Sequence, residues 1–217
     1  MIITNDENGE WIENDLFCLF FGNKNSQLFT ANNNIQFGHQ VHKADLLEVD
    51  KLPDGSSCFI DDSDGLWTKM PKLELGLYTA DCVPCFIHQN NTLYSLHLGW
   101  RSLHLGLLDK ALQKVSKSEY LYIYIGPHIQ FDSFEVGEEV FKSFERQLSP
   151  YKSTEWFRVL SNNKFKLSLS KIIELKTRSY NSQIYSSKID TYITKSYCSY
   201  RKQHQTKERN ISFAFLK

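Results

Sequence analysis

Short apolar runs separated by Gly, Asn, Asp and Pro recur along the chain, and this pattern predicts a protein rich in β-strands. Some runs alternate apolar and polar residues, as strands with one buried face do. We expect strands at 11–21, 46–49, 56–60, 73–79, 83–88, 92–98, 120–125, 184–187 and 211–216. The segment 73–98 therefore holds three successive strands, with Asn90 and Asn91 forming the turn between the last two.

Helical periodicity marks three further segments. Apolar residues recur there at intervals of three and four, which predicts amphipathic helices at 102–115, 136–148 and 168–180. Ser168 is a residue type that caps helix N-termini. This mixture predicts an α+β fold of mixed β-sheets covered by helices. No repeat, low-complexity segment or linker divides the chain, so we expect a single domain over residues 1–217.

The charge balance narrows the classes of partner. The chain has 217 residues, with 25 Lys and Arg against 25 Asp and Glu, so no global positive field attracts nucleic acid or an anionic membrane. The most apolar early run, 16–21, is too short to span a bilayer, and the first residues lack the basic start of a secretion signal. We expect a cytoplasmic protein that binds neither nucleic acid nor membrane.

The cysteines are odd in number and irregularly spaced, at positions 18, 58, 82, 85 and 198. This arrangement predicts free thiols in a reducing compartment rather than a disulfide framework. Cys82 and Cys85 form a C-x-x-C pair, but Cys85 lies inside an apolar run and is expected to be a small core residue. A four-cysteine zinc site would need a second such pair, which the sequence lacks.

Residues suited to chemistry gather where the strands of segment 73–98 end. Cys82 follows the first strand, and His97 ends the third, just before Gly99-Trp100-Arg101, where a helix is expected to begin. A helix N-terminus together with Arg101 favours an anion such as phosphate, although an ordinary ion pair is an equal alternative for Arg101. The acidic cluster 61–64 lacks the closing glutamate and flanking helices of a calcium loop, so we expect a turn there.

Two motifs connect this segment with a known family. Thr79-Ala80-Asp81-Cys82-Val83-Pro84 and His97-Leu98-Gly99-Trp100-Arg101 resemble the T-A-D-C-x-P and H-A-G-W-R signatures of the YfiH family, also called the laccase-domain or multicopper polyphenol oxidase family. Further matching motifs follow in the family's order, at Gln40-Val41-His42, Ser63-Asp64-Gly65-Leu66, Gly126-Pro127-His128-Ile129, Phe134-Glu135-Val136-Gly137, Ser199-Tyr200-Arg201 and Arg209. The resemblance implies a layered α/β/β/α-like fold with Asp64-Gly65 as a conformational element near the site.

The resemblance also implies a metal site formed by His42, Cys82 and His97. Two imidazoles and one thiolate leave a fourth tetrahedral position, as in catalytic zinc sites. A second model stays open, in which Cys82 is a nucleophile, His97 is its base and His42 is an orienting or oxyanion group. Zinc fits better than copper, because the seven histidines include no H-x-H pair of the kind that multicopper clusters use.

The activity that the resemblance implies is that of a zinc-dependent purine nucleoside phosphorylase, acting as a monomer on a nucleoside and phosphate. Adenosine deaminase and methylthioadenosine phosphorylase are further implied activities. The catalytic residues would be Cys82, His97 and Asp81, and the substrate contacts Gln40, Arg101, Arg201 and Arg209. Asp81 would act as an orienting group or as a general base. Gln40 would contact substrate or be a hydrogen-bonded buried side chain.

Two alternatives of other classes stay open. The first is a peptidoglycan-editing amidase, which would cut a muramyl-nucleotide precursor with zinc or with Cys82. The second is a non-catalytic zinc-binding protein. It is motivated by a shortened N-terminal region, because segment 21–37 lacks the family's R-x-G-G-x-S and S-L-N-L motifs. Asp190 is a separate departure from the family pattern, since it stands where Cys commonly precedes Thr191. His39 and His128 are expected to be structural.

Overall fold

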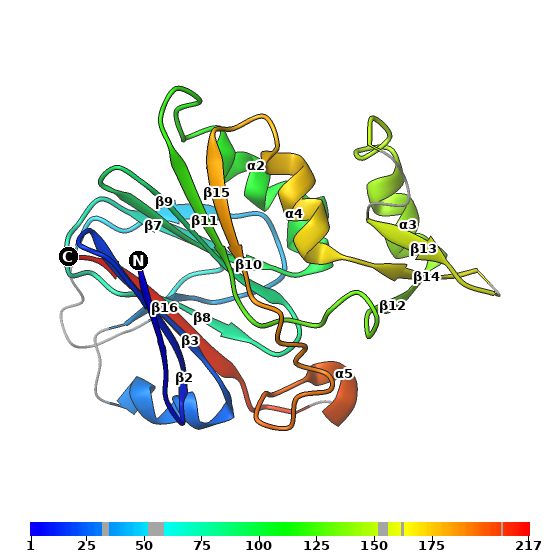
Figure 1. Ribbon diagram of the computed structural model, residues 1–217, viewed down its shortest axis with the longest axis horizontal. Helices are drawn as coiled ribbons and strands as arrows, with labels where there is room; N and C mark the ends of the chain where they lie inside the picture. The colour runs from blue at the N-terminus through cyan, green and yellow to red at the C-terminus, as the bar shows by residue number, and fades with distance from the viewer. Residues whose placement is uncertain (32–34, 52–58, 152–155, 162, 205) are drawn as a thin grey trace.

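Two mixed β-sheets pack face to face, and a third, small sheet lies beside them (Figure 1). The computed structural model describes residues 1–31, 35–51, 59–151, 156–161, 163–204 and 206–217. In the order of their neighbours, the first sheet contains β1 (Ile2–Asn5), β2 (Gly9–Glu13), β3 (Phe17–Gly22), β16 (Asn210–Leu216), β8 (Leu75–Thr79), β4 (Gln36–Gly38) and β6 (Phe59–Ile60).

The second sheet is built around the predicted hairpin of segment 83–98. Its strands are, in order, β15 (Ser182–Ser186), β11 (Leu121–Ile125), β9 (Val83–Gln89), β10 (Thr92–Leu98), β7 (Gly65–Thr68) and β5 (Leu46–Glu48). The small third sheet contains β12 (Glu135–Gly137), β14 (Lys164–Leu167) and β13 (Phe157–Val159). Parallel pairs join β4 to β6 and β8, β5 to β7, and β11 to β15, so the sheets are mixed as expected.

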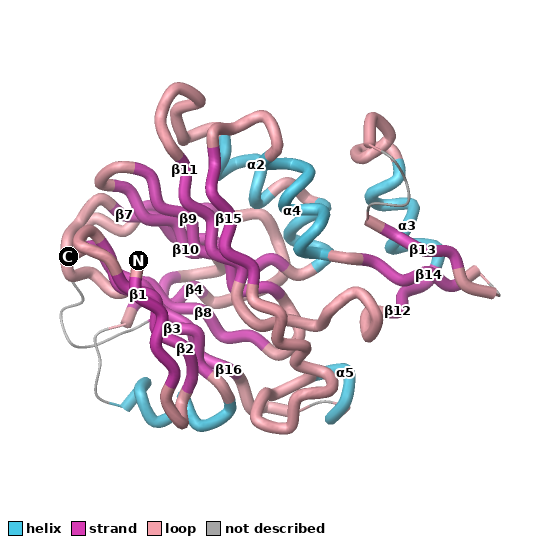
Figure 2. Tube along the Cα trace, viewed as in Figure 1, coloured by secondary structure: helices cyan, strands magenta, loops and turns pink. Residues whose placement is uncertain are grey.

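Helices cover the second sheet on its outer face, where α2 and α4 lie next to each other (Figure 2). The helices are α1 (Trp100–His104), α2 (Leu107–Leu112), α3 (Glu138–Glu145), α4 (Leu169–Thr177) and α5 (Tyr200–Gln203). A 3-10 helix, η1 (Lys24–Ala31), adjoins the first sheet, where Ser26 Oγ accepts a hydrogen bond from the Ile211 N–H at 2.9 Å. The architecture is therefore the α+β class that the sequence predicts, with mixed sheets covered by helices.

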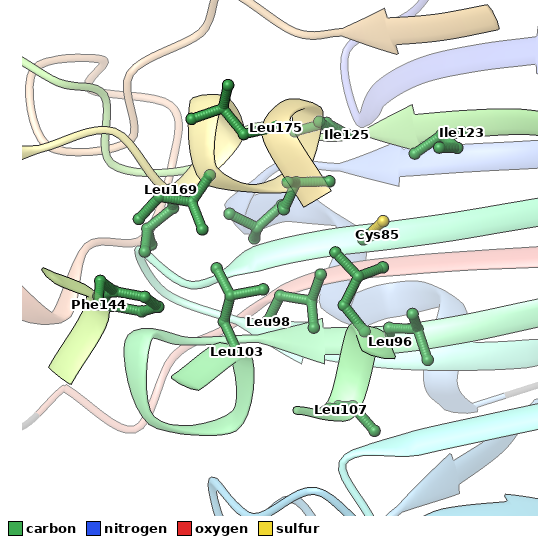
Figure 3. Close-up of a cluster of buried hydrophobic side chains, with 14 of the residues drawn as sticks. Cys85, Leu96, Leu98, Leu103, Leu107, Ile123, Ile125, Phe144, Leu169 and Leu175 are labelled. Atoms are coloured by element: carbon green, nitrogen blue, oxygen red, sulfur yellow. The ribbon is translucent and has the colours of Figure 1, made fainter. Parts of the chain in front are cut away.

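Successive side chains of β9 point to opposite faces of the second sheet, so this strand contributes to two separate cores. Cys85 and Ile87 belong to the core on the helical side. Figure 3 shows part of this core, with Cys85 among its members. Phe86 points the other way, into the core between the two sheets. A strand buried on both faces reads as a continuous apolar run, which is how 83–88 reads. Cys85 is completely buried, so its interpretation as a small core residue is confirmed.

The expected helix at 102–115 is wrong in one respect, because it is two helices. Gly106 has a φ of +90°, a left-handed conformation that ends α1 and redirects the chain into α2. The helix expected at 136–148 likewise begins later, at Glu138, because the preceding residues pair with β14 as strand β12. The helix at 168–180 holds, and Ser168 Oγ accepts the Lys171 N–H as an N-cap.

Two strand predictions also need correction. The segment 11–21 is not one strand but the hairpin β2–β3, because Asn14 Oδ1 accepts the N–H groups of Leu16 and Phe17 and so stabilises a turn. Of the strand expected at 56–60, only Phe59–Ile60 falls within the described residues, and it forms β6. The loop expected at 202–208 begins as helix α5. No helix in the described part of the chain has the length and apolar character of a membrane span.

Candidate metal centre and its cleft

His42, Cys82 and His97 converge at one end of the β9–β10 hairpin. Their ligand atoms all lie within 4.8 Å of one another, and Cys82 Sγ is 3.8 Å from His42 Nε2. His97 pairs with Pro84 across the hairpin, and Cys82 immediately precedes β9, so the register brings both to the same end. His42 comes from the loop after β4, where it adopts a left-handed φ of 60°. Three residues far apart in sequence therefore form one cluster of metal-binding atoms.

Asp64 connects the two histidines of this cluster. Its buried carboxylate accepts the N–H groups of Val41, His42 and Lys43, at 3.1, 2.9 and 2.7 Å. The same carboxylate lies 2.7 Å from His97 Nδ1. A carboxylate accepts, so Nδ1 carries the proton and Nε2 is left as the ligand atom of His97. Asp64 therefore fixes the loop that carries His42 and the tautomer of His97.

The ionisation of these groups follows from their contacts. Burial alone would raise the pKa of Asp64, but the hydrogen bonds from His97 and the Lys43 N–H lower it. Burial also opposes the charged form of His97, yet the neighbouring Cys82 thiolate and Asp64 raise its pKa to about 9. Against burial, His97 and His42 lower the pKa of Cys82 to about 6. Cys82 is therefore a thiolate at neutral pH, the form that binds metal.

The donor set and the space around it fit a zinc ion. Two imidazole nitrogens and one thiolate are typical zinc ligands, and three protein ligands leave a fourth position open. Gly99 adjoins the cluster, and a Cβ there would approach Cys82 Sγ to 2.9 Å and His42 Cδ2 to 3.2 Å. Glycine at this position therefore keeps the ligand side chains unobstructed.

The cluster opens into a cleft of about 960 Å³. One side comes from the first sheet, through Gly38, Phe59 and Tyr78. The other side comes from Trp100 of α1 and from segment 134–140, which includes β12 and the start of α3. Residues after β15, among them Tyr200 and Lys207, complete the lining. This volume suits a small organic substrate rather than a macromolecule.

The three arginines expected to contact substrate all line this cleft, but they differ in their partners. Arg101 makes no hydrogen bond or ion pair within the described residues, and its guanidinium stacks on Trp100 at 4.5 Å. Arg201 Nη1 donates to the Glu135 carbonyl at 2.8 Å, and Arg209 Nη1 donates to the Thr206 and Glu208 carbonyls at 2.7 Å. Arg101 is therefore the arginine best placed to receive an anion. Because α1 has only five residues, the side chain of Arg101 carries this expectation, not the helix terminus.

Asp81 lines the cleft, but both of its carboxylate oxygens are engaged. Oδ1 accepts the Thr191 hydroxyl and Oδ2 accepts the Arg201 N–H, each at 2.7 Å. Asp81 has a left-handed φ of 86° and directly precedes Cys82. Two roles were expected for Asp81, an orienting group or a general base, and these contacts fit an orienting group.

Gln40 is likewise engaged on both sides of its amide. Its Nε2 donates to the Tyr78 carbonyl at 2.7 Å, and its Oε1 accepts the Tyr78 N–H at 2.8 Å. The amide thus pairs with β8 as a neighbouring strand would. Of the two interpretations left open, the hydrogen-bonded structural side chain fits this geometry, although Gln40 also borders the cleft.

Comparison with known proteins agrees with this geometry. Residues 23–217 match the family model described as multi-copper polyphenol oxidoreductase laccase. The chain belongs to this family. A purine nucleoside phosphorylase from Clostridium acetobutylicum is 30% identical over 167 residues, covering 72% of this chain and 68% of the relative. The purine nucleoside phosphorylase YfiH from Shigella flexneri is 32% identical over 108 residues, but the match covers only 48% of this chain and 43% of the relative.

Two solved structures share the fold. YfiH from Bacillus licheniformis superimposes with a TM-score of 0.84 at 20% identity, covering 99% of both chains. YlmD from Geobacillus stearothermophilus gives the same TM-score and identity, covering 100% of this chain and 99% of the other. The resemblance to the YfiH family inferred from the motifs is thus confirmed.

One departure from the family pattern, Asp190, has a structural explanation within this chain. Asp190 Oδ2 accepts the Ser133 hydroxyl, and Oδ1 accepts the Tyr192 N–H at 3.0 Å, so this acid holds a turn. Its neighbour Thr191 holds Asp81, which links the turn to the cysteine of the cluster. Asp190 therefore supports the site from outside the cleft.

Two other histidines near the motifs have the structural character that the sequence predicts. His128 is buried, its Nδ1 lies 2.8 Å from the Gly126 carbonyl, and burial lowers its pKa to about 4. His39 borders the cleft, but its ring is bonded to Asp62 on the surface at 2.9 Å.

The sequence did not predict that Asp64 contacts both His42 and His97. It also did not predict that the rings of Tyr78 and Phe59 lie next to each other in the cleft. The signal for Asp64 was present in the matched motif Ser63-Asp64-Gly65-Leu66, but a carboxylate in an acidic turn reads as a solvated group. No motif in the sequence indicates the pair of rings, because Phe59 and Tyr78 come together through the pairing of β4 with β6 and β8.

Proposed function

We propose that this chain is a zinc-dependent purine nucleoside phosphorylase. The observation that carries the proposal is the convergence of His42, Cys82 and His97 in a cleft that also holds Arg101, which makes no hydrogen bond or ion pair within the described residues. The names of the relatives from Clostridium acetobutylicum and Shigella flexneri support the same activity. Zinc is favoured over copper because the cluster offers one site with one thiolate and two imidazoles.

The reaction replaces the bond between ribose C1′ and the purine nitrogen with a bond from C1′ to a phosphate oxygen. The electron pair of the broken bond leaves with the purine, which takes up a proton. When bound, zinc supplies a Lewis acid that polarises a substrate atom. Arg101 binds the phosphate dianion, and the guanidinium of Arg201 contributes its remaining N–H groups. Asp64 and Asp81 hold the ligands in place.

The same cleft would accept related purine substrates. We propose adenosine deaminase and methylthioadenosine phosphorylase as further activities, because they need the same metal and purine-binding groups. The four cysteines within the described residues are unpaired, which supports a reducing, cytoplasmic location. We also propose that residues 1–217 act as one domain and as a monomer.

A second candidate is a hydrolase that uses Cys82 as its nucleophile, such as an amidase acting on a muramyl-nucleotide precursor. It is favoured by one observation, the proximity of the Cys82 thiolate to His97, which would serve as its base. The two candidates differ in what they need. Phosphorolysis requires added phosphate and bound metal, whereas a cysteine hydrolase would continue after metal removal.

The test is zinc content together with phosphate-dependent release of hypoxanthine from inosine, measured for wild type, Cys82→Ala and Cys85→Ala. Cys85 is the matched control, since it lies three residues away in the same C-x-x-C pair but is buried in the core. We expect one zinc per chain and turnover in wild type and Cys85→Ala, with both lost in Cys82→Ala. Turnover by metal-free wild type would reject the zinc model, and zinc without turnover would reject the phosphorylase.

A further inference from the structure

Two aromatic side chains in the cleft have no part in the metal cluster or in the anion contacts. Tyr78 of β8 and Phe59 of β6 line the side formed by the first sheet. Their ring planes lie within 10° of parallel, with centroids 6.0 Å apart, and Phe59 is 55% exposed. We name this pair of rings the Tyr78–Phe59 platform. Exposed apolar surface inside a cleft marks a place where a ligand binds.

The protein holds the Tyr78 ring in a fixed position. Beneath it lies the buried ring of Phe37, stacked at a centroid distance of 4.1 Å. Gly76 is opposite Phe37 in the pairing of β4 with β8, and any Cβ at Gly76 would collide with the Phe37 ring. The absence of that Cβ lets Phe37 lie flat on the sheet. The amide of Gln40 then fixes the backbone of Tyr78 through two hydrogen bonds.

The platform is connected to the metal cluster through Gln40. Gln40, which is bonded to Tyr78, precedes His42 by two residues, so their Cα atoms are at most about 7 Å apart. Arg101 of α1 lines the same cleft, and its guanidinium makes no hydrogen bond or ion pair within the described residues. One cleft thus contains an aromatic surface, the metal cluster and a cation.

We propose that the Tyr78–Phe59 platform binds the planar purine base of the nucleoside by stacking, an inference that rests on the proposed function. The three groups in the cleft correspond in chemistry to the three parts of the reactants, with an aromatic surface for the base, a metal cluster for the reacting centre and a guanidinium for the phosphate. Stacking on an aromatic ring depends on the flat area of the base and tolerates changes at its edges. The platform therefore binds hypoxanthine and adenine with similar affinity, and Gln40 acts as a positioning residue for Tyr78.

The test uses equilibrium dialysis of labelled hypoxanthine with the zinc-loaded protein, beside steady-state kinetics with inosine in the forward direction and ribose 1-phosphate in the reverse direction. The variants are Phe59→Ala, Phe59→Trp and Tyr78→Leu. Tyr120→Leu is the matched control, because Tyr120 is 42% exposed but lies outside the cleft lining. Phe59 lies at an exposed position, so its variants do not depend on core packing.

We expect hypoxanthine to bind Phe59→Ala and Tyr78→Leu about 10-fold to 100-fold more weakly than wild type. Phe59→Trp and Tyr120→Leu should both bind hypoxanthine as tightly as wild type does. The KM for inosine should rise in parallel, while zinc content and the KM for ribose 1-phosphate, which has no base, stay at the wild-type values.

The outcomes separate this inference from the proposed function. If wild type turns over inosine and both platform variants bind hypoxanthine within threefold of wild type, the platform is rejected and the phosphorylase stands. If wild type binds hypoxanthine through the platform but releases none from inosine, the phosphorylase is rejected and the platform stands. Wild type that fails to bind hypoxanthine at millimolar concentration overturns the platform as a purine site.

Discussion

His97 and His88 lie on the two strands of one hairpin, yet the protein uses them in opposite ways. Both are almost completely buried, with exposed fractions of 3% and 2%. His97 lies 2.7 Å from the Asp64 carboxylate and beside Cys82, and its pKa is raised to about 9. His88 packs between the rings of Phe17 and Tyr122, and burial lowers its pKa. Within the described residues, neither ring nitrogen of His88 has a hydrogen-bond partner.

The difference shows that hydrogen-bonding partners, not burial, suit a histidine to bind a metal. Burial opposes the charge on both side chains, because both lose contact with water. Only His97 has a carboxylate that fixes its proton on Nδ1 and aims Nε2 at the cluster. At the other end of the hairpin, the aromatic neighbours of His88 leave it neutral. Variants at each end therefore test this account of the site.

The largest effect is expected from removing the imidazole at the cluster end. His97→Leu should lower zinc affinity by more than about 100-fold, since the loss of a residue that only orients a ligand already costs 10-fold to 100-fold. His88→Leu, the matched control, should keep both zinc and turnover, because the ring nitrogens of His88 make no hydrogen bond in the part of the chain that the structure describes. Chelator competition measures both affinities. Equal losses in the two variants would contradict the comparison.

The second largest effect is expected from changing Asp64, the acid that orients His97. Asp64→Asn should lower zinc affinity about 10-fold to 100-fold, because an amide cannot hold the Nδ1 proton and three backbone N–H groups as a carboxylate does. Asp62→Asn is the control, since Asp62 is exposed and bonded to the surface residue His39. Retained zinc affinity in Asp64→Asn would mean that His97 is oriented by its packing alone.

A pH profile tests the electrostatic half of the comparison. In metal-free protein the pKa of Cys82 is lowered to about 6, so its alkylation by iodoacetamide should reach a plateau above about pH 7. In His97→Leu the midpoint should move up toward the ordinary thiol value near 9, because the neighbouring positive charge is lost. Peptide mapping follows Cys82 separately from the other cysteines. A midpoint that stays near 6 in the variant would show that a group other than His97 lowers the pKa of Cys82.

The smallest effect is expected at the other end of the hairpin. The pKa of His88 is lower in the folded protein than its ordinary value of 6.5, so the unfolded chain binds the proton more tightly. Stability is therefore complete above pH 6.5 and falls as the pH drops below it. His88→Leu should reduce the loss of unfolding free energy between pH 8 and pH 5, because the variant has no imidazole at position 88 that takes up a proton on unfolding. Urea unfolding at both pH values measures this loss, and an unchanged loss would show that the pKa of His88 is the same in the folded and unfolded states.

Much of the fold followed from local pattern, whereas the three candidate ligands came from the resemblance of the motifs to a known family. The strand Thr92–Leu98 has the predicted bounds, because its alternation and the Asn90-Asn91 turn act within a few residues. The T-A-D-C and Gly-Trp-Arg motifs located Cys82 and His97 at strand ends that the register then brought together. The position of Gly106 within a helical pattern was ambiguous, since a glycine there is compatible with either a continuous or a broken helix.

The remaining features depend on contacts between distant segments. Asp64 lies 22 residues from His42 and 33 from His97 along the chain, so its carboxylate could not be assigned to either before folding. The engagement of Gln40 with Tyr78, 38 residues later, is of the same kind. The partners of Asp81 lie still farther away, at Thr191 and Arg201. Periodicity carries no information about such pairs.

The most direct test of the metal centre is X-ray absorption spectroscopy at the zinc edge of the loaded protein. The account predicts one sulfur neighbour at about 2.3 Å and nitrogen or oxygen neighbours at about 2.0–2.1 Å, two of them from imidazoles. The sulfur should disappear from the zinc spectrum of Cys82→Ala. A wild-type spectrum without sulfur, or with two sulfur neighbours, would contradict the site formed by His42, Cys82 and His97.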